Sequence, residues 1–194
     1  MYGPEGRRYA DLISGIGVSV VGHRHPSVIK AIREQLDRHL HVMVYGEYIQ
    51  STPNQLAEKI TAKLPAHLNC CYFVNSGAEA NEGALKLAKR YTGRSEIISC
   101  RGSYHGSTGA AMALTQSTDE RFFGPFVPGV RKIPSPNRDR PPFGVEGEAG
   151  ELLCADALEQ EILAAGPELV AAFIAEPISV ANGVHVPALS YWRR

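Results

Sequence analysis

The chain has no excess charge of either sign. Its 194 residues include 20 Lys and Arg and 20 Asp and Glu, so the formal net charge is zero. No overall electric field would draw such a chain to nucleic acid or to an anionic membrane. The sequence therefore predicts small molecules or further copies of the chain as partners, with no nucleic acid and no membrane.

Long apolar runs are also missing. No stretch approaches the roughly 18 apolar residues of a membrane span, and the start, MYGPEGRRYAD, lacks the apolar segment of a signal peptide. The four cysteines form no C-x-x-C pair, and the adjacent Cys70 and Cys71 lie in an apolar run, which is typical of buried free thiols. These features predict a cytoplasmic protein.

Several motifs of nucleotide, hydrolase and metal sites are absent. GIGVSV begins like a dinucleotide fingerprint but has Val20 where the third glycine belongs, and no G-x-x-x-x-G-K-[ST], G-x-S-x-G or H-E-x-x-H occurs. His23 and His25 lie in one loop without further ligands at usable spacing, which favours turn or surface roles over metal binding. The sequence predicts no metal site.

The residues that are present predict a folded domain. With 44% hydrophobic residues, the chain can bury a sizeable core. Apolar residues at spacings of three and four predict a helix over about 26–40. A second helix is predicted to about residue 64, with Thr52 as its N-cap, and a short strand over 9–13.

From residue 70 onward, strand and helix patterns alternate. A proline-rich and glycine-rich loop is expected over about 122–150. The alternation predicts an α/β fold with an open, mostly parallel sheet covered by helices on both faces. The expected strands are 70–75, 96–100 and 169–176, and the expected helices are 78–91, 106–115 and 155–165.

The join between the first of these strands and its helix is a candidate site. Ligands of an open α/β sheet bind beyond the carboxyl ends of the strands, where a helix N-terminus offers unpaired N–H groups. Ser76, Gly77 and Ala78 lie at that point, so a phosphate or oxyanion could be held there. The spacing alone favours a plain tight turn, and Glu79 is expected to complement the helix dipole.

Three motifs in order add a family resemblance: FVNSGAEANEGALKLAKR, RGSYHGST and FIAEP. Together they resemble the class III, ornithine-type branch of the pyridoxal-phosphate (PLP) aminotransferases, and most of all acetylornithine and other ω-amino-acid aminotransferases. The resemblance implies a fold-type I large domain, incomplete here. It assigns residues 1–45 to a small-domain segment with its connecting helix, and residues 46–194 to the first part of the large domain.

The resemblance also implies PLP as the cofactor, with roles for individual residues. Tyr104 would stack on the pyridine ring, His105 would line the pocket, and Glu176 would face the cofactor. Each has a structural alternative: a core or surface tyrosine, a hydrogen-bonding histidine, and a capping or loop carboxylate. The cofactor-binding residues so implied are Ser76, Gly77, Ala78, Tyr104, His105 and Glu176.

The implied reaction moves an amino group from an amino acid, an ω-amino donor of the acetylornithine or ornithine type, to a 2-oxo acid. The family's Schiff-base lysine and pyridine-nitrogen aspartate would lie beyond Arg194, so no catalytic residue is assigned and the chain alone is expected to be inactive. Ser179 stands where the family usually has glutamine. Two alternatives stay open: a catalytically dead binding module, and a same-fold isomerase, racemase or decarboxylase.

The resemblance further implies a homodimer. The segment HVMVYGEYIQ, residues 41–50, is rich in aromatic and apolar residues and poor in charge, as interface cores are. We expect it to lie near the partner subunit, with Tyr48 close to the other site.

Overall fold

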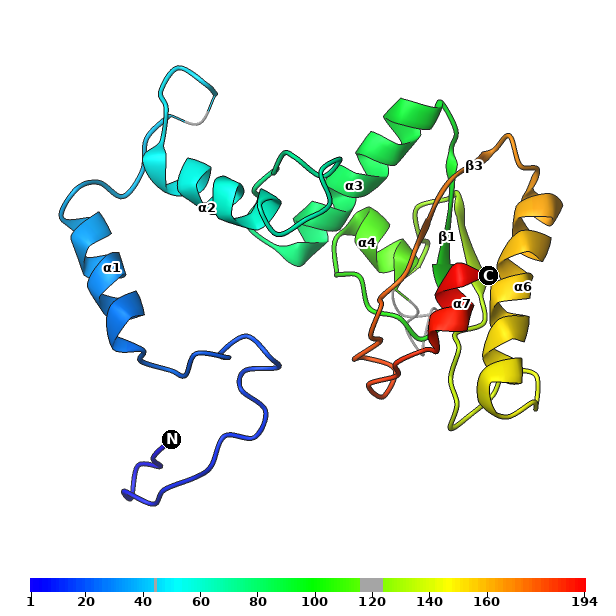
Figure 1. The fold of residues 1–194 in the computed structure, drawn as a ribbon, viewed down its shortest axis with the longest axis horizontal. Helices are drawn as coiled ribbons and strands as arrows, with labels where there is room; N and C mark the ends of the chain where they lie inside the picture. The colour runs from blue at the N-terminus through cyan, green and yellow to red at the C-terminus, as the bar shows by residue number, and fades with distance from the viewer. Residues whose placement is uncertain (44, 116–123) are drawn as a thin grey trace. The chain divides into compact units, whose positions relative to one another are not determined.

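The computed structural model describes residues 1–43, 45–115 and 124–194 (Figure 1). Residue 44 of the expected interface segment and residues 122–123 of the expected loop therefore lie outside the described residues. The chain divides into two compact units, Met1–Cys70 and Cys71–Arg194, and each is described by itself. In the described parts of the chain, no helix has the length and apolar character that crossing a membrane requires.

The first unit contains two helices, α1 (Pro26–Leu36) and α2 (Ser51–Thr61). α1 begins where the sequence predicts. It ends before residue 40 because its last turn tightens, with the N–H groups of Arg38 and His39 both bonded to Gln35 O, at 3.1 and 3.0 Å. All residues of both helices are described, and none of them is buried.

Two local predictions for this unit are wrong. Gln50, not Thr52, is the N-cap of α2, and the helix has no side-chain cap. Pro53 is tolerated in the first turn because its missing N–H would have no helical partner there. Residues 9–13 form no strand: the Asp11 carboxylate accepts bonds from the N–H groups of Ile13 and Ser14, at 3.1 and 2.9 Å, which makes a turn instead.

The second unit contains a parallel three-stranded sheet, with β1 (Glu96–Cys100) between β2 (Val130–Ile133) and β3 (Val170–Ile174). The predicted open parallel sheet is thus confirmed. β2 was missed because it lies inside a stretch rich in proline and glycine. The helices of this unit are α3 (Gly77–Thr92), α4 (Gly109–Leu114), α6 (Gly147–Ala165) and α7 (Leu189–Arg193).

The predicted strand over 70–75 is absent from the structure. These residues belong to no strand or bridge in the described chain, so their N–H and C=O groups have no ladder partner. An apolar run favours a strand only where a neighbouring strand can pair with it. For the same reason Cys70 is exposed and Cys71 half-buried, which corrects the expectation of two buried thiols.

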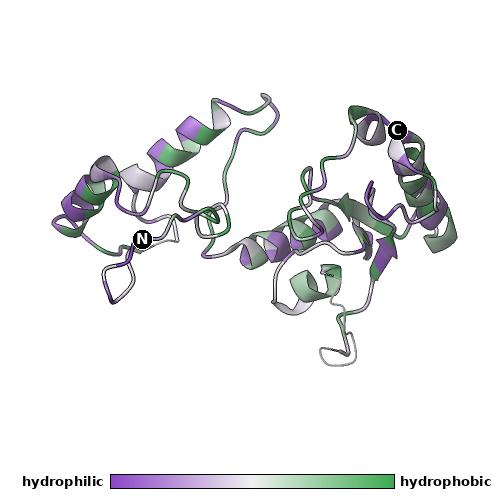
Figure 2. Ribbon diagram, turned by 90° about the horizontal axis from the view of Figure 1, so that it is seen from below, coloured by the Kyte–Doolittle hydropathy of each residue, from purple (hydrophilic) through white to green (hydrophobic). Residues whose placement is uncertain are grey.

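Helices cover both faces of the sheet, as predicted. On one face Ile97 packs with Leu85 of α3 and Leu114 of α4. On the other face Ile98 and Ile133 pack against α6, whose contributions include Leu158, Ile162 and Ala165. Figure 2 shows hydrophobic residues in strands of the sheet and in helices that lie beside it. Because neighbouring strand residues point to opposite faces, the Ile97-Ile98 pair serves both cores.

Candidate functional site

The N-terminus of α3 is capped by side chains from its own first turn. Ser76 is the N-cap, and its Oγ accepts a bond from the Glu79 N–H at 3.1 Å. The Glu79 carboxylate in turn accepts from the Asn75 N–H at 2.7 Å. Capping sets the direction of the first turn, and the Ser76 hydroxyl can still donate its own proton. The N–H groups of the first turn point out of the helix as donors.

Gly77 borders open space. A Cβ built on it would meet no atom within 4 Å, and its φ is not in the left-handed region. A tight turn therefore does not require glycine at this position. A bulky anion approaching the backbone does, and this favours the anion-binding interpretation over the plain turn.

Sequence-distant residues share one hollow with this turn. Residues 104–108, here called the tyrosine loop, line it together with Ser76, Gly77, Ala78 and Asn81. Its volume of about 540 Å³ is in the range of small-molecule sites. Tyr104 is 57% exposed as a residue, so an aromatic surface is available there. Five of the six predicted site residues thus come together: Ser76, Gly77, Ala78, Tyr104 and His105.

Gly106 brings the tyrosine loop close to α3. A Cβ on Gly106 would lie 2.6 Å from Ala78 Cβ and 3.1 Å from Ala111 Cβ. Its backbone φ of 130° is also one that residues with a side chain rarely adopt. Glycine is required at position 106 on both grounds.

We therefore expect Gly106→Ala to lower the free energy of unfolding by about 2–4 kcal/mol, through overpacking and backbone strain. Gly83→Ala is the matched control, because Gly83 is an interior residue of α3 whose added Cβ meets Tyr72 at an ordinary 3.4 Å. It should stabilise the protein by about 0.5–1 kcal/mol. Urea titration measures both, and equal effects would contradict the close approach.

His105 is a buried member of the site. It is 7% exposed, its N–H donates to Thr115 Oγ1 at 2.8 Å, and its carbonyl accepts from Asn81 Nδ2 at 2.6 Å. Within the described chain its Nε2 is buried without a hydrogen-bond partner. Burial lowers the pKa of the His105 imidazole, and this effect is larger than that of the negative charge of Glu176, which raises the pKa. The ring is therefore neutral at neutral pH.

Glu176 does not line the hollow; it contacts the backbone of the tyrosine loop. It follows β3, and its Oε1 accepts from the Tyr104 N–H at 3.2 Å and from Ser179 Oγ at 3.5 Å. Its side chain lines a small space shared with Cys100 and Tyr191. The structure therefore assigns Glu176 a contact that orients the backbone of Tyr104.

Two residues of α3 were not found from the sequence. Asn81 bonds His105, as described, and Glu82 Oε1 accepts from Thr108 Oγ1 at 2.6 Å. This bond is the largest cause of a lowered pKa of the Glu82 carboxyl, and hydrogen bonds from the N–H groups of Ala110 and Ala111 lower the pKa further. The available signal was Asn81 itself, a poor helix former in a helix rich in Ala, Glu and Lys.

The lysines of the chain all belong to the described residues, and none of them lines the hollow. Lys132 Nζ, on β2, donates to Ser99 Oγ at 2.8 Å and to Leu114 O. Lys86 and Lys89 line a separate groove beside Tyr72. The hollow therefore has no amine among the described residues that could bond covalently to a carbonyl ligand.

Comparison with known proteins decides the family. The sequence model of the family described as Aminotransferase class-III matches residues 1–194. The chain belongs to the class-III aminotransferases. A probable 4-aminobutyrate aminotransferase of Bacillus subtilis is 35% identical over 97% of the chain and 44% of its own length. A leucine/methionine racemase of Thermococcus litoralis is 37% identical over 98% of the chain and 43% of its own length.

The fold of the family is also shown. The crystal structure of an (S)-enantioselective omega-transaminase from Thermomicrobium roseum superposes with a TM-score of 0.92, at 32% identity, over 99% of this chain and 44% of that one. The arrangement is fold type I, as predicted. The chain spans less than half the length of these relatives.

Class-III aminotransferases are PLP-dependent enzymes. The residues present here fit that group: donors at a helix N-terminus lie beside the open space over Gly77, and the exposed Tyr104 ring borders the same hollow. A phosphate needs such donors, and a pyridine ring needs an aromatic surface.

Proposed function

We propose that this chain forms the phosphate-binding and ring-stacking part of a PLP-dependent aminotransferase. The reaction transfers an amino group from an amino acid, an ω-amino donor of the acetylornithine or ornithine type, to a 2-oxo acid. One observation carries the proposal: the first turn of α3 and the tyrosine loop line a single hollow. When bound, PLP supplies an electron sink for carbanion chemistry at the amino acid.

Each of the six residues predicted for the site has a defined task in the proposal. The N–H groups of Gly77 and Ala78 and the hydroxyl of Ser76 bind the phosphate, whose negative charge is favoured at a helix N-terminus. Tyr104 covers one face of the pyridine ring, and Glu176 holds the Tyr104 backbone. The neutral His105 excludes water from this side of the hollow without adding a charge.

The assembly and compartment belong to the same proposal. Tyr45, Tyr48 and Ile49 are 86, 67 and 92% exposed, which supports a partner subunit at residues 41–50, as in a homodimer. The free thiols Cys100 and Cys154 support a reducing cytoplasm. We propose the division into residues 1–45 and 46–194 as small-domain and large-domain parts; the boundary after Cys70 falls inside the second part.

A second candidate reaction is racemisation, supported by the similarity to the leucine/methionine racemase. The two candidates differ in product. Transamination of an ω-amino donor with 2-oxoglutarate produces glutamate, whereas racemisation produces the enantiomer of the amino acid and no glutamate. Chiral chromatography of the reaction mixture of the whole protein distinguishes them, and the absence of both products would contradict both.

Tyr104→Ala should weaken PLP binding about fivefold to tenfold, because ring stacking contributes roughly 1 kcal/mol beyond buried area. Tyr104→Phe, which keeps the ring, should bind within about twofold of the unmodified protein on the same reasoning. Titration of the apoprotein with PLP, followed by protein fluorescence, measures both. Unchanged binding in Tyr104→Ala would contradict the stacking role.

A further inference from the structure

The tyrosine loop is attached to α3 by two side chains, those of Asn81 and Glu82. Asn81 Nδ2 donates to His105 O at 2.6 Å, and Glu82 Oε1 accepts from Thr108 Oγ1 at 2.6 Å. Both bonds join residues more than twenty positions apart in the sequence. Asn81 and Glu82 lie one turn beyond the residues proposed to hold the phosphate, so α3 carries both the phosphate donors and the attachment of the loop.

Glu82 makes the larger share of this attachment. Besides Thr108, its Oε1 accepts from the N–H groups of Ala110 and Ala111, at 2.9 and 3.2 Å, in the first turn of α4. One carboxylate thus bonds the end of the tyrosine loop and the helix that follows it. Bonds to an ionised acceptor are stronger than neutral ones.

Other contacts of the loop, and of Ser103 directly before it, lead to other elements. Ser103 Oγ donates to Cys100 O at 2.6 Å, Tyr104 N–H donates to Glu176, and His105 N–H donates to Thr115 Oγ1. These contacts orient the loop on the sheet and on α4, but they do not set its distance from α3. The contact of Gly106 with Ala78 sets a lower limit to that distance, and the bonds of Asn81 and Glu82 set the upper limit.

We propose that Glu82 is a positioning residue, which holds Tyr104 at the separation from Ser76, Gly77 and Ala78 that lets one molecule contact both. The inference rests on the proposed function. It makes a specific claim: loss of Glu82 affects a ligand that has both a phosphate and a ring, and spares a ligand that has only the phosphate.

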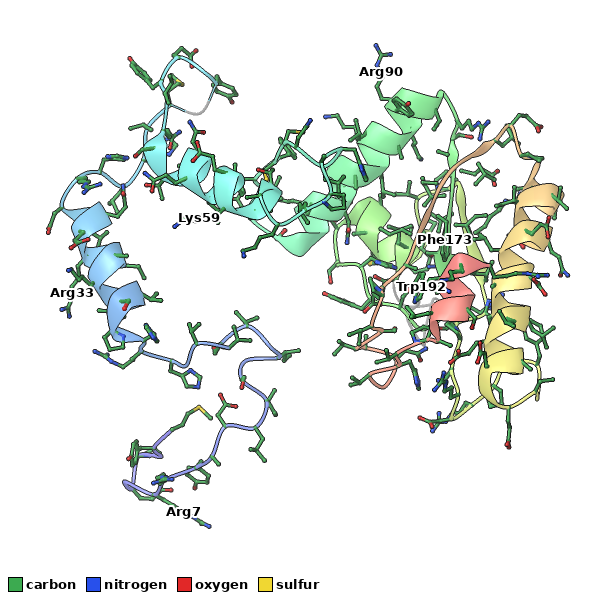
Figure 3. All side chains as sticks on the ribbon, in the orientation of Figure 1. Arg7, Arg33, Lys59, Arg90, Phe173 and Trp192 are labelled. Atoms are coloured by element: carbon green, nitrogen blue, oxygen red, sulfur yellow. The ribbon has the colours of Figure 1, made fainter. Side chains whose placement is uncertain are left out.

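The test uses two ligands on the apoprotein of the whole protein, inorganic phosphate and PLP, by isothermal titration calorimetry. Glu82→Ala should raise the Kd for PLP about tenfold and leave the Kd for phosphate within about twofold. Glu82→Gln keeps an acceptor oxygen and should show a smaller rise for PLP. Arg90→Ala removes a charge at the far end of α3, where the side chain points outward (Figure 3), and should change neither constant.

Thr108→Val keeps the test decisive if Glu82→Ala fails to fold, since it removes the hydroxyl that donates to Glu82 and leaves the bonds from the N–H groups of Ala110 and Ala111 to Glu82 in place. It should also weaken PLP selectively. Equal weakening of PLP and phosphate in Glu82→Ala or Thr108→Val would overturn the positioning role, and so would an unchanged Kd for PLP in both. If the unmodified apoprotein binds no phosphate, the proposed function fails first, and the inference fails with it.

Discussion

Gly77→Asp should lose PLP and phosphate binding by a factor of a hundred or more while the protein stays folded. The substitution places a carboxylate where a dianion has to bind, and two unit charges about 4 Å apart repel by about 4 kcal/mol at the effective dielectric of a protein surface. A Cβ at this position meets no atom within 4 Å, so the new side chain begins in open space and we expect the ligand-free chain to accept it.

The same substitution should slightly increase the stability of the folded chain, although it weakens binding. An added negative charge in the first turn of α3 interacts favourably with the helix dipole, by about 0.3–1 kcal/mol. Gly77→Asn is the matched control, because it adds nearly the same bulk without the charge and separates the steric part of the loss. Calorimetric titration with phosphate and PLP, together with thermal unfolding, measures binding and stability. A phosphate Kd within threefold of the unmodified value in Gly77→Asp would disprove the anion site.

The 194-residue chain, purified by itself, should show no measurable transamination. The reaction needs a lysine to bond the cofactor and to move a proton at the substrate carbon. None of the lysines lines the hollow, and Lys132, on the sheet, bonds Ser99 and Leu114. Loss of such a lysine removes most of the rate of the chemical step, so the expected decrease is many orders of magnitude.

Two measurements check this expectation. Glutamate formation from an ω-amino donor and 2-oxoglutarate, in the presence of PLP, should stay at the level of a reaction without protein. Borohydride treatment followed by peptide mass spectrometry should find no single lysine that carries phosphopyridoxyl. Sustained turnover, or stoichiometric labelling of one lysine such as Lys86, would show that an amine of this chain reaches the site.

Local patterns in the sequence were sufficient for the elements whose stability is largely local. The Ser76 cap, the apolar spacing of α3 and Gly93 after its last residue define that helix without reference to other segments. The strands β1 and β3 were likewise predicted, and β3 most directly, because a continuous run of Val, Ala, Phe and Ile is typical of a strand covered on both faces. The ordered motifs also sufficed to identify the family.

Pairing and long-range contact were decided only by the tertiary structure. Residues 70–75 have the composition of a strand but no partner in the described chain, whereas the less typical β2 is a strand because it pairs with β1. Strand formation depends on a neighbour that the local sequence does not specify.

The candidate site divides along the same line. The sequence by itself determined the chemistry of the first turn of α3, since the cap and the donors come from consecutive residues, 76–79. The resemblance implied that Tyr104 shares this site, but only the tertiary structure shows what places it there: the close approach of Gly106 to Ala78 and the bond of Glu82 to Thr108, which join segments more than twenty residues apart. Such contacts depend on how two helices pack against one sheet, and no spacing within either motif encodes that geometry.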